Sequence, residues 1–597
     1  MKKHNRKKLS PNLLPGIAQG AGAPSSPQRR AFLGKMGAAA TAGAAALAGP
    51  GVLSAAQPEG FAQAARPEAP AGVPNGRVAE SFALRVQMAT QDAVAGPARN
   101  VSNGDEARYP DKAGTYTKGL LHNAYGQVDP GSYASFKKAL TTGKFSDFEN
   151  IIMGGTRTLN GPQGGLCFDL EAMDSSQFGQ PQVPPAPKTA SDQNATELLE
   201  HYWAALLRDV AFTDYGTSAL AAAAAAELGS QYSYLGPRNS GGQVTPNLLF
   251  RGIFPGETLG PYVSQFLLIP AFFGAQPLSQ QFQTTLPGID YGTDFTSWLE
   301  IQNGVDTGQR NQIDSQLRYR RTGRDMTALT HMDVLFQEYF TAMLVLTTIN
   351  ANPPGSFTPG GAPVNPGCPY VHSTTENGFG TFGWPDFAAM IGEVAVKALN
   401  AVWYQKWFVH LRPRPEAHGG LVHLIKTGQG NHTNATFSPF ILNSNGLQQT
   451  FNKTGTWLLP LAYPEGSPTH PSYPTGHGTV GGACITMLKF IFDGTYVIPD
   501  PVVPTSDGLS LQPYTGPDAG QLTVNGELNK LGHNVSFGHG IHAGIHWRSD
   551  TDTSLLLGEA VALSFLRDKA QTYNEPFTIH IQKFDGTTAT ISNQGNH

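Results

Sequence analysis

Apolar residues at helical spacing are the feature that most constrains the fold of this 597-residue chain. In the longest such segment, residues 385–410, apolar residues recur at steps of three to five, and a proline suits the first turn. Alternating strand patterns are scarce, so the chain is predicted to be mainly α. Helices are predicted at residues 197–208, 218–228, 333–348, 385–410, 475–492 and 551–567. The candidate N-caps of the last helix are Ser549, Thr551 and Asp552.

Long loops rich in glycine and proline connect these segments, for example at residues 353–384 and 498–520. The chain holds 69 glycines and 45 prolines, about a fifth of its residues, against roughly 12% in average proteins. Only 14% of residues are charged, which excludes a coiled coil, and the glycines follow no collagen period. Hydrophobic residues make up 40%. The sequence therefore predicts a globular protein whose ordered loops cross a large core.

The first 64 residues differ in composition from the rest. They begin with basic residues, and Arg29 and Arg30 precede Phe-Leu and an alanine- and glycine-rich stretch. This pattern resembles a twin-arginine export signal. It predicts a periplasmic or extracellular protein. The signal would be cleaved after Ala56 or Ala64. The alternative is a disordered low-complexity tail. The apolar run is too short to span a bilayer, and no later run of 18 apolar residues follows, so no membrane span is predicted.

The rest of the chain is acidic. Residues 1–64, the predicted leader, hold 8 of the 40 basic residues and one of the 44 acidic ones. Residues 65–597 therefore have a net charge of −11. This balance argues against a nucleic-acid partner, because no long basic stretch lies outside the leader. No clear linker divides the remainder. Residues 65–330 and 331–597 are interpreted as the N-terminal and C-terminal parts of one domain.

Three cysteines are too few for a disulfide scaffold. Export permits one bridge, for which Cys167 and Cys368, both in surroundings rich in glycine and proline, are the favoured pair. Cys484 lies in an apolar helical pattern and is interpreted as a buried thiol. The cysteine spacing does not indicate a metal site.

Cations, histidines and glycines concentrate in three C-terminal segments. These are residues 406–418 (KWFVHLRPRPEAH), 467–477 (SPTHPSYPTGH) and 539–550 (HGIHAGIHWRSD). Lys406 and Arg414 supply charge-assisted donors for a tetrahedral oxyanion. Thr475 and Gly476 add a hydroxyl and a backbone N–H at a predicted helix N-terminus, which favours an anion. The three segments together predict a site for a phosphate-like ion.

Each of these residues alone has a simpler interpretation. A lysine at a helix end, such as Lys406, is usually a solvated charge, and a single histidine is more often structural than catalytic. Arg412 and Arg548 are interpreted as charges on the surface or behind the site. His546 lies four residues before Asp550, whose carboxylate can orient the ring, so this histidine could act as a ligand or nucleophile.

Taken together, the three segments resemble the vanadium-dependent haloperoxidases, in particular the bromoperoxidase branch of algae and bacteria. This superfamily shares its site with phosphatidic-acid-phosphatase-like acid phosphatases. The resemblance covers most of residues 95–570. Further matching segments are 103–106 (NGDE), 118–123 (KGLLHN), 126–130 (GQVDP), 202–210 (YWAALLRDV) and 260–266 (GPYVSQF).

The resemblance implies vanadate as cofactor and a role for each site residue. The residues implied to hydrogen-bond its oxygens are Lys406, Arg414, Thr475 and Gly476. His546 would bind the vanadium, and Asp550 would orient the His546 ring. His477 would be the acid–base group, paired with Asp333, and Lys406 would also polarise bound peroxide. His470 matches an extra histidine typical of bromoperoxidases, which implies bromide or iodide rather than chloride.

Two positions depart from the family pattern. Thr475 stands where the family usually has serine, and the hydroxyl is kept. The family's second arginine, six residues before the final histidine, falls on Gly540 here, preceded by His539. A helical irregularity could bring His539 into that place, because seven residues is near two turns; otherwise one vanadate contact is missing.

The implied reaction oxidises bromide or iodide with hydrogen peroxide to hypohalous acid equivalents that halogenate small organic acceptors. The implied fold is two four-helix bundles with the site at the end of one, and the family is commonly homo-oligomeric. Two alternatives stay open. One is an exported acid phosphatase with His546 as nucleophile and His477 as general acid. The other is a non-catalytic oxyanion-binding protein. It stays open because Gly540 stands where the family has its second arginine.

Overall fold

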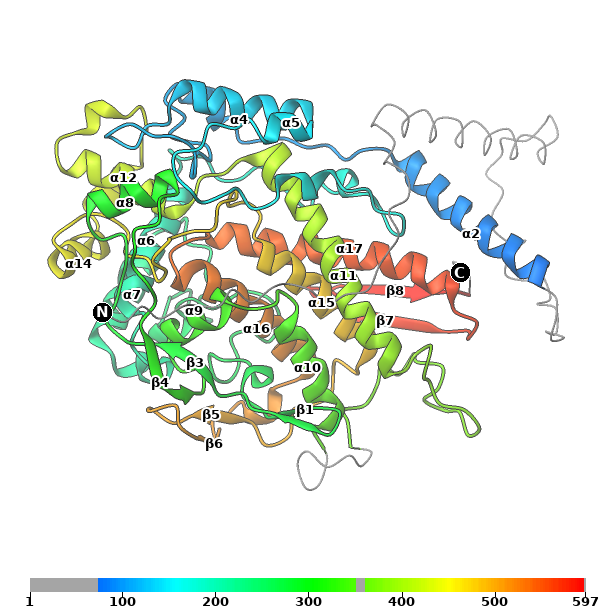
Figure 1. Cartoon of the computed structure of the whole chain (residues 1–597). Coiled ribbons are helices and arrows are strands. Elements are labelled where there is room, and N and C mark those ends of the chain that lie inside the picture. The colour runs from blue at the N-terminus through cyan, green and yellow to red at the C-terminus, as the bar shows by residue number, and fades with distance from the viewer. Residues whose placement is uncertain (1–73, 351–359, 595–597) are drawn as a thin grey trace, which may run out of the picture. The chain divides into compact units, whose positions relative to one another are not determined.

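Two central helices, α15 (Gly476–Ile491) and α17 (Arg548–Thr572), pack against each other (Figure 1). Every residue of α15 is buried, as expected for a helix with neighbours on all sides. The structure is a computed structural model that describes residues 74–350 and 360–594. The predicted leader, residues 1–64, lies outside the described residues.

α15 also packs against α11 (Trp384–Tyr404) and α16 (Val524–Phe537), and α17 contacts both of these helices, so the four form a bundle. The close approach of α15 and α17 depends on glycine. A Cβ at Gly482 would lie 2.2 Å from the carbonyl oxygen of Leu555. The two backbones can meet there only because no side chain intervenes.

A second group of helices packs around α6 (Asp192–Leu207), which comes from the N-terminal part of the chain. Its neighbours there are α7 (Ala219–Ser230), α12 (Pro415–Lys426), α13 (Pro439–Leu442) and α14 (Asn445–Thr454). α6 also contacts η9 (Gly538–His542), a π-helical turn that follows α16 directly. The two groups of helices therefore meet at one of the predicted site segments.

The prediction of a mainly α fold is confirmed. The other α-helices are α2 (Pro74–Ala95), α3 (Asp105–Arg108), α4 (Pro130–Thr142), α5 (Phe145–Phe148), α8 (Phe295–Asn303), α9 (Gly323–His331) and α10 (Gln337–Thr348). The 3₁₀ turns are η1 (Pro162–Leu166), η2 (Ser175–Gln177), η3 (Phe212–Thr217), η4 (Pro246–Leu248), η5 (Gln265–Leu267), η7 (Gly430–His432) and η8 (Ala519–Gln521).

The strands of the described residues form four two-stranded antiparallel sheets. The pairs are β1 (Ala271–Phe273) with β2 (Gln276–Leu278), β3 (Phe282–Thr285) with β4 (Ile313–Arg318), β5 (Val502–Pro504) with β6 (Leu511–Pro513), and β7 (Thr578–Gln582) with β8 (Thr588–Ser592). In β7, Ile579 and Ile581 are buried while their neighbours are exposed. The C-terminal hairpin thus adds one apolar face to the core.

Two predicted helices differ from the observed ones beside the candidate site. The helix predicted from residue 333 begins at Gln337, so Asp333 lies in the preceding loop. The helix predicted to run to His410 ends as α-helix at Tyr404 and continues as a π-helical turn, η6 (Gln405–His410). A π turn holds one more residue than an α turn, a difference that apolar spacing does not reveal.

The last predicted helix begins earlier than expected. Its N-cap is Trp547, in an extended conformation, so the predicted N-caps Ser549, Thr551 and Asp552 lie inside α17 and that prediction is wrong. The physical reason is a hydrogen bond from the backbone N–H of Trp547 to Asp550 Oδ2, at 3.1 Å. This carboxylate in the first turn fixes where the helix starts.

The predicted disulfide between Cys167 and Cys368 is wrong, because all three cysteines are free. Cys167 is exposed and follows η1, where Gly165 approaches Tyr404 at the end of α11. Cys368 lies in a small cleft with Trp384 at the beginning of α11. A 21-residue helix separates the two regions by about 30 Å. Cys484 is buried, as predicted.

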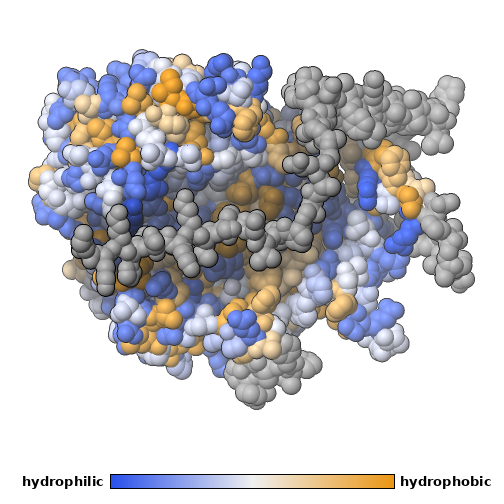
Figure 2. All heavy atoms as spheres, viewed as in Figure 1, coloured by the Kyte–Doolittle hydropathy of each residue, from blue (hydrophilic) through white to orange (hydrophobic). Residues whose placement is uncertain are grey.

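One large hydrophobic cluster joins both groups of helices, from α6 through α11, α15, α16 and α17 to the C-terminal hairpin. On the face shown in Figure 2, hydrophilic and hydrophobic residues are intermixed. Within residues 74–350 and 360–594, every helix is too short or too polar to cross a membrane.

Candidate oxyanion site

The three predicted segments converge at the N-terminal end of α15. Four buried imidazoles lie next to one another there. The ring centroids of His470 and His546 are 6.1 Å apart, those of His546 and His539 are 5.6 Å apart, and those of His539 and His477 are 3.9 Å apart. Histidines from two separate stretches of sequence therefore share one small volume.

Lys406 is the second residue of η6 and is 0% exposed, which removes its interpretation as a solvated charge. Its Nζ donates to the carbonyl oxygens of Pro471 at 2.9 Å and Ser472 at 2.7 Å. An ammonium group has three N–H donors, so one remains for a ligand. Burial and then the charge of Arg414 hold the pKa of Lys406 well below its usual value. A bound anion would favour its charged form.

Arg414 occupies the N-cap position of α12, before Pro415 in the first turn. Its Nε donates to the carbonyl oxygen of His470 and its Nη1 to that of Ile545, both at 2.9 Å. Its Nη2 lies 3.0 Å from His470 Nδ1. Burial lowers the pKa of Arg414 to about 10. Arg414 thus joins the segment before α15 to the segment before α17.

The N-terminus of α15 supplies further donors. Thr475 is the N-cap, but its hydroxyl makes no capping hydrogen bond. Its Oγ1 is buried and has no partner among the described residues. Backbone N–H groups in the first turn of a helix, together with the helix dipole, favour an anion. A Cβ at Gly476 would lie 3.2 Å from the Trp403 ring, so glycine allows close packing beside this N-terminus.

His546 has one nitrogen engaged and one free. Its Nδ1 lies 3.0 Å from Asp550 Oδ2, and Nε2 has no hydrogen-bond partner within residues 74–350 and 360–594. Burial, followed by the charges of Arg414 and Lys406, holds the pKa of His546 well below its usual value. A neutral imidazole with its proton on Nδ1 offers the Nε2 lone pair to a ligand.

His477, in the first turn of α15, pairs with Asp333 in the loop before α10. Its Nε2 lies 3.1 Å from Asp333 Oδ1 and 3.0 Å from Oδ2. The structure therefore places together two residues that are 144 positions apart. The carboxylate holds the ring in one orientation and leaves the other nitrogen for proton exchange.

His539 reaches the site because η9 is a π turn. The extra residue of this turn places Gly540 backbone against His546, with a Cβ at Gly540 meeting His546 Cβ at 3.2 Å. The His539 ring stacks on His477 at 3.9 Å, and its Nδ1 is buried without a partner among the described residues. Burial and the neighbouring His477 keep the pKa of His539 well below its usual value. The helical irregularity, which the sequence left as one of two alternatives, is present.

Comparison with known proteins identifies the family. The chain is 34% identical over 547 residues to a vanadium-dependent bromoperoxidase of Ascophyllum nodosum. The alignment covers 87% of this chain and 94% of the relative. It is 30% identical over 610 residues to a vanadium-dependent bromoperoxidase of Corallina pilulifera, with 86% and 98% covered. The chain belongs to the vanadium-dependent bromoperoxidase family. No family model matches it.

The fold agrees with this family. The homohexameric structure of the second vanadate-dependent bromoperoxidase of Ascophyllum nodosum aligns with a TM-score of 0.81 and 27% identity. The alignment covers 91% of this chain and 94% of that structure. The likeness thus extends over most of the chain.

The site fits vanadate, the oxyanion of the vanadium-dependent bromoperoxidases. Vanadate is a tetrahedral anion, and the site presents a spare Lys406 donor, the Arg414 guanidinium, the unpartnered hydroxyl of Thr475 and the free Nε2 of His546. Among residues 74–350 and 360–594, no group of three His, Cys, Asp or Glu side chains could hold a metal ion. The donors and the one free imidazole nitrogen suit an oxyanion with a single imidazole ligand.

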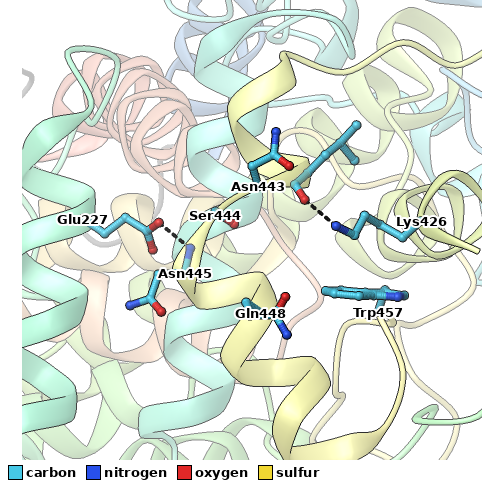
Figure 3. Close-up of a pocket in the computed structure, with 8 residues that line it drawn as sticks. Glu227, Lys426, Asn443, Ser444, Asn445, Gln448 and Trp457 are labelled. Atoms are coloured by element: carbon cyan, nitrogen blue, oxygen red, sulfur yellow. Dashed lines mark hydrogen bonds between the residues drawn. The ribbon is translucent and has the colours of Figure 1, made fainter.

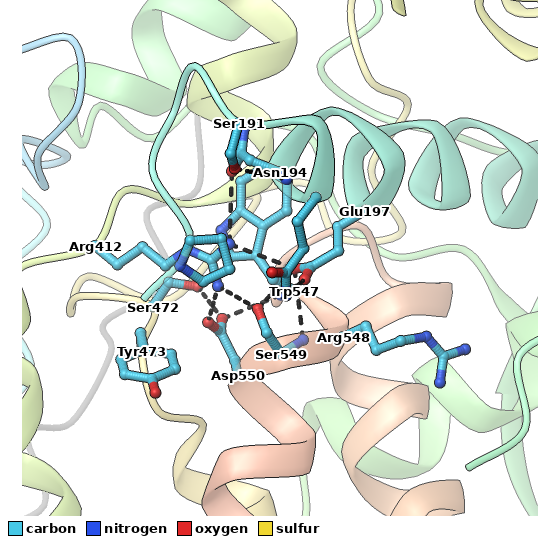
Figure 4. A network of polar contacts seen from close by, with 12 residues as sticks. Ser191, Asn194, Glu197, Arg412, Ser472, Tyr473, Trp547, Arg548, Ser549 and Asp550 are labelled. Atoms are coloured by element: carbon cyan, nitrogen blue, oxygen red, sulfur yellow. Dashed lines mark hydrogen bonds and ion pairs between the residues drawn. The ribbon is translucent and has the colours of Figure 1, made fainter. Parts of the chain in front are cut away.

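Sequence reasoning missed part of the bromoperoxidase site. Arg412 and Arg548 are 2% and 1% exposed, so the surface alternative of their interpretation is wrong. Arg412 lies behind the site, the other alternative, where it pairs with Asp550 (Figure 4), whereas Arg548 does not. Trp403 was also missed, although its ring lies 4.8 Å from His470. Its position three residues before Lys406 was the only available signal. Ser472, within the 467–477 segment, donates to Asp550.

A cleft of about 460 Å³ lies elsewhere in this bromoperoxidase fold, where α7, α12 and α14 meet (Figure 3). Its polar groups already have partners. Glu227 accepts from the backbone N–H of Asn445 at 2.6 Å and from Trp203 at 2.8 Å. Lys426 donates to a backbone carbonyl and lies 4.3 Å from the Trp457 ring centroid. None of the predicted site residues lines it.

Proposed function

We propose that this chain is a vanadate-dependent peroxidase that oxidises bromide or iodide with hydrogen peroxide, and that the hypohalous acid equivalents halogenate small organic acceptors. The relatives named vanadium-dependent bromoperoxidase support this function. The single observation that carries it is the free Nε2 of His546, beside Lys406, Arg414 and an unpartnered Thr475 hydroxyl.

The roles of the site residues follow from these contacts. His546 would ligate vanadium through Nε2, and Asp550 would keep the proton on Nδ1. The donors to the oxyanion would be Lys406, Arg414, Thr475, Gly476 and His539. Bound vanadate supplies a Lewis acid that activates peroxide without changing its own oxidation state.

Proton supply is the task of His477. Oxidation of bromide by hydrogen peroxide yields hypobromous acid and water, and it consumes one proton per turnover. Asp333 orients His477 at 3.0 Å, so the ring can deliver that proton in a fixed direction. Lys406 would polarise bound peroxide through its remaining N–H.

His470 is proposed to favour bromide or iodide over chloride. Its ring is held between Trp403 at 4.8 Å and the guanidinium of Arg414 at 3.0 Å. A cation beside an aromatic and an imidazole ring offers a large, polarisable anion both charge and a soft surface. Burial, with Arg414 and Lys406 nearby, keeps the pKa of His470 well below its usual value.

His546→Ala tests this function. The variant should lose vanadate-dependent bromination of a phenolic dye with peroxide and bromide, because the vanadium ligand is removed. His542→Ala is the control. It removes a buried imidazole at the end of η9, four residues before His546, that bonds to Tyr262 at 2.8 Å, and should keep vanadate dependence. The phosphatase alternative gains support instead if the wild type hydrolyses phosphate esters, is blocked by vanadate and shows no bromination.

We also propose that residues 1–64 export the chain by the twin-arginine route and that the mature protein is a homo-oligomer. The paired Arg29 and Arg30 support the first proposal, and the homohexameric relative supports the second. Replacing both arginines with lysine should retain the protein in the cytoplasm, and light scattering of the mature protein should give a multiple of the chain mass.

A further inference from the structure

Arg412 lies directly behind the proposed vanadate site, where it connects Asp550 to Glu197 (Figure 4). Its Nη1 donates to Asp550 Oδ1 at 2.7 Å and to Ser549 Oγ at 2.8 Å. Its Nη2 lies 3.3 Å from Glu197 Oε2. The three charged side chains are at most 3% exposed. Solvent therefore screens their interaction weakly.

The two oxygens of Asp550 serve different partners. Oδ2 faces His546 Nδ1 at 3.0 Å and accepts from the backbone N–H of Trp547 at 3.1 Å and from the Ser472 hydroxyl. Oδ1 faces Arg412. Arg412 therefore fixes the rotation of the carboxylate, and the carboxylate in turn fixes the ring plane of His546.

Arg412 itself has little freedom to move. Its guanidinium lies 4.7 Å from the ring centroid of Trp547. Leu411, just before it, has a φ of 47°, a left-handed conformation that ends η6 and turns the chain. A fork-shaped group held by an aromatic face and two carboxylates is well suited to set an angle.

A second buried pair of the same chemistry joins α6 directly to α17. Arg548, the first residue of α17, contacts Glu200 on α6 through Nε at 3.0 Å. In Figure 4 the Arg548 side chain extends away from Asp550. Among the described residues it donates only to Glu200 and to the carbonyl oxygen of Arg251. This pair matches the first in burial and charge but does not reach His546.

We propose that Glu197 and Arg412 are a positioning pair for the oxyanion site. They hold Asp550 so that His546 keeps Nδ1 toward the carboxylate and Nε2 toward the ligand. The inference rests on the proposed function, because it concerns a ligand bound at His546. It makes α6, from the N-terminal part of the chain, part of the site although none of its residues is assigned a ligand contact.

Two readouts on the full-length, vanadate-free protein test the pair. Titration calorimetry measures the affinity for inorganic vanadate. Nitrogen-15 NMR of labelled histidine measures the tautomer of His546, whose signal is assigned by its loss in His546→Ala. Arg412→Met should weaken vanadate binding about 10- to 100-fold, the range for groups that orient a metal ligand, and should mix the two tautomers. Glu197→Gln should do the same to a smaller extent, and Arg412→Lys should recover part of the affinity.

The control variant is Arg548→Met. It should lower the unfolding temperature as Arg412→Met does, but leave vanadate affinity and the His546 tautomer unchanged. Equal losses of affinity in both variants, or an unchanged tautomer and affinity in Arg412→Met, would overturn the positioning role. If Arg412→Met does not fold, Glu197→Gln and Arg412→Lys decide by the same criteria. If the wild type binds no vanadate, the proposed function fails, while the His546 tautomer still tests the pair.

Discussion

At the scale of single residues, His539 is where this chain departs furthest from its family. The resemblance places a second arginine at Gly540, and the π turn η9 brings His539 next to the site instead. A guanidinium has five donors, whereas a neutral imidazole has one. Lys406 and Arg414 are then the cationic side chains left for the oxyanion. The motif residues could be predicted because their spacing is fixed. The place of His539 could not, because one extra residue in η9 shifts the alignment to Gly540.

His539→Arg should tighten vanadate binding, because a charged donor would replace a neutral one. A hydrogen bond to a charged group contributes roughly 1.5–3 kcal/mol, and repulsion from Lys406 and Arg414 reduces that gain, so we expect about a tenfold lower Kd. Calorimetry with vanadate measures it. His539→Gln, which keeps a neutral donor, is the control and should bind as the wild type does. Weaker binding by a folded His539→Arg protein would contradict this account of the position.

The buried charged residues were the hardest to predict from the sequence. Arg412 was expected on the surface or behind the site because arginine is seldom fully buried. Its burial depends on Glu197, 215 positions away, and on the face of Trp547. No local pattern encodes that contact. Asp333 was found through the resemblance alone, and its loop geometry differs from the helix that apolar spacing predicted.

At the scale of secondary structure, apolar spacing located α6, α7, α10, α11, α15 and α17, but it missed α2, α16 and the two π turns. η6 and η9 directly follow α11 and α16, and each contains a predicted ligand residue, Lys406 and His539. An added residue leaves the apolar period on either side intact, so only the backbone reveals it. Both turns lie at the ends of helices that pack against α15, which keeps the irregular backbone next to the site.

The contact between α15 and α17 gives a stability prediction. Gly482→Ala should destabilise the protein by roughly 1–3 kcal/mol, as overpacking does, because its Cβ would lie 2.2 Å from Leu555 O. Gly392→Ala is the matched control. That glycine also lies in a helix, α11, but has nothing within 4 Å of its Cβ position, so alanine should be neutral or stabilising there. Thermal unfolding measures both, and equal unfolding temperatures would contradict the close approach.

His533 links α16 to α17 and to the loop between η4 and η5, and makes stability depend on pH. Its Nε2 lies 2.9 Å from Asp552 and its Nδ1 contacts Glu257. Burial alone would lower the pKa of His533, but the two carboxylates raise it from 6.5 to about 9. The pairing therefore stabilises the fold fully below pH about 6.5, and this contribution of about 3 kcal/mol is lost as pH rises through 9.

Denaturant unfolding between pH 6 and 10 measures this effect. The free energy of unfolding of the wild type should fall across that range, and His533→Gln should show a flatter profile. A profile that is equally steep in the variant would assign the pH dependence to other groups.

At the scale of the whole molecule, composition predicted the architecture but not the assembly of the site. Much glycine and proline, little charge and helical spacing together indicate helices joined by long loops, and the structure agrees. The contact between the α6 group and the bundle around α15 could not be predicted, because it depends on side chains far apart in sequence. The acidic remainder of the chain, at −11 without the leader, makes the buried cations of the site a local exception in charge.

Dependence on vanadate tests the central claim most directly. Vanadate-free protein is titrated with vanadate while the oxidation of chloride, bromide and iodide by hydrogen peroxide is followed with a phenolic dye. We predict a rate that rises to saturation with vanadate, for bromide and iodide far more than for chloride. A halogenation rate that is independent of vanadate, or no halogenation at saturating vanadate, would contradict the assignment of His546, Lys406 and Arg414 to a vanadate site.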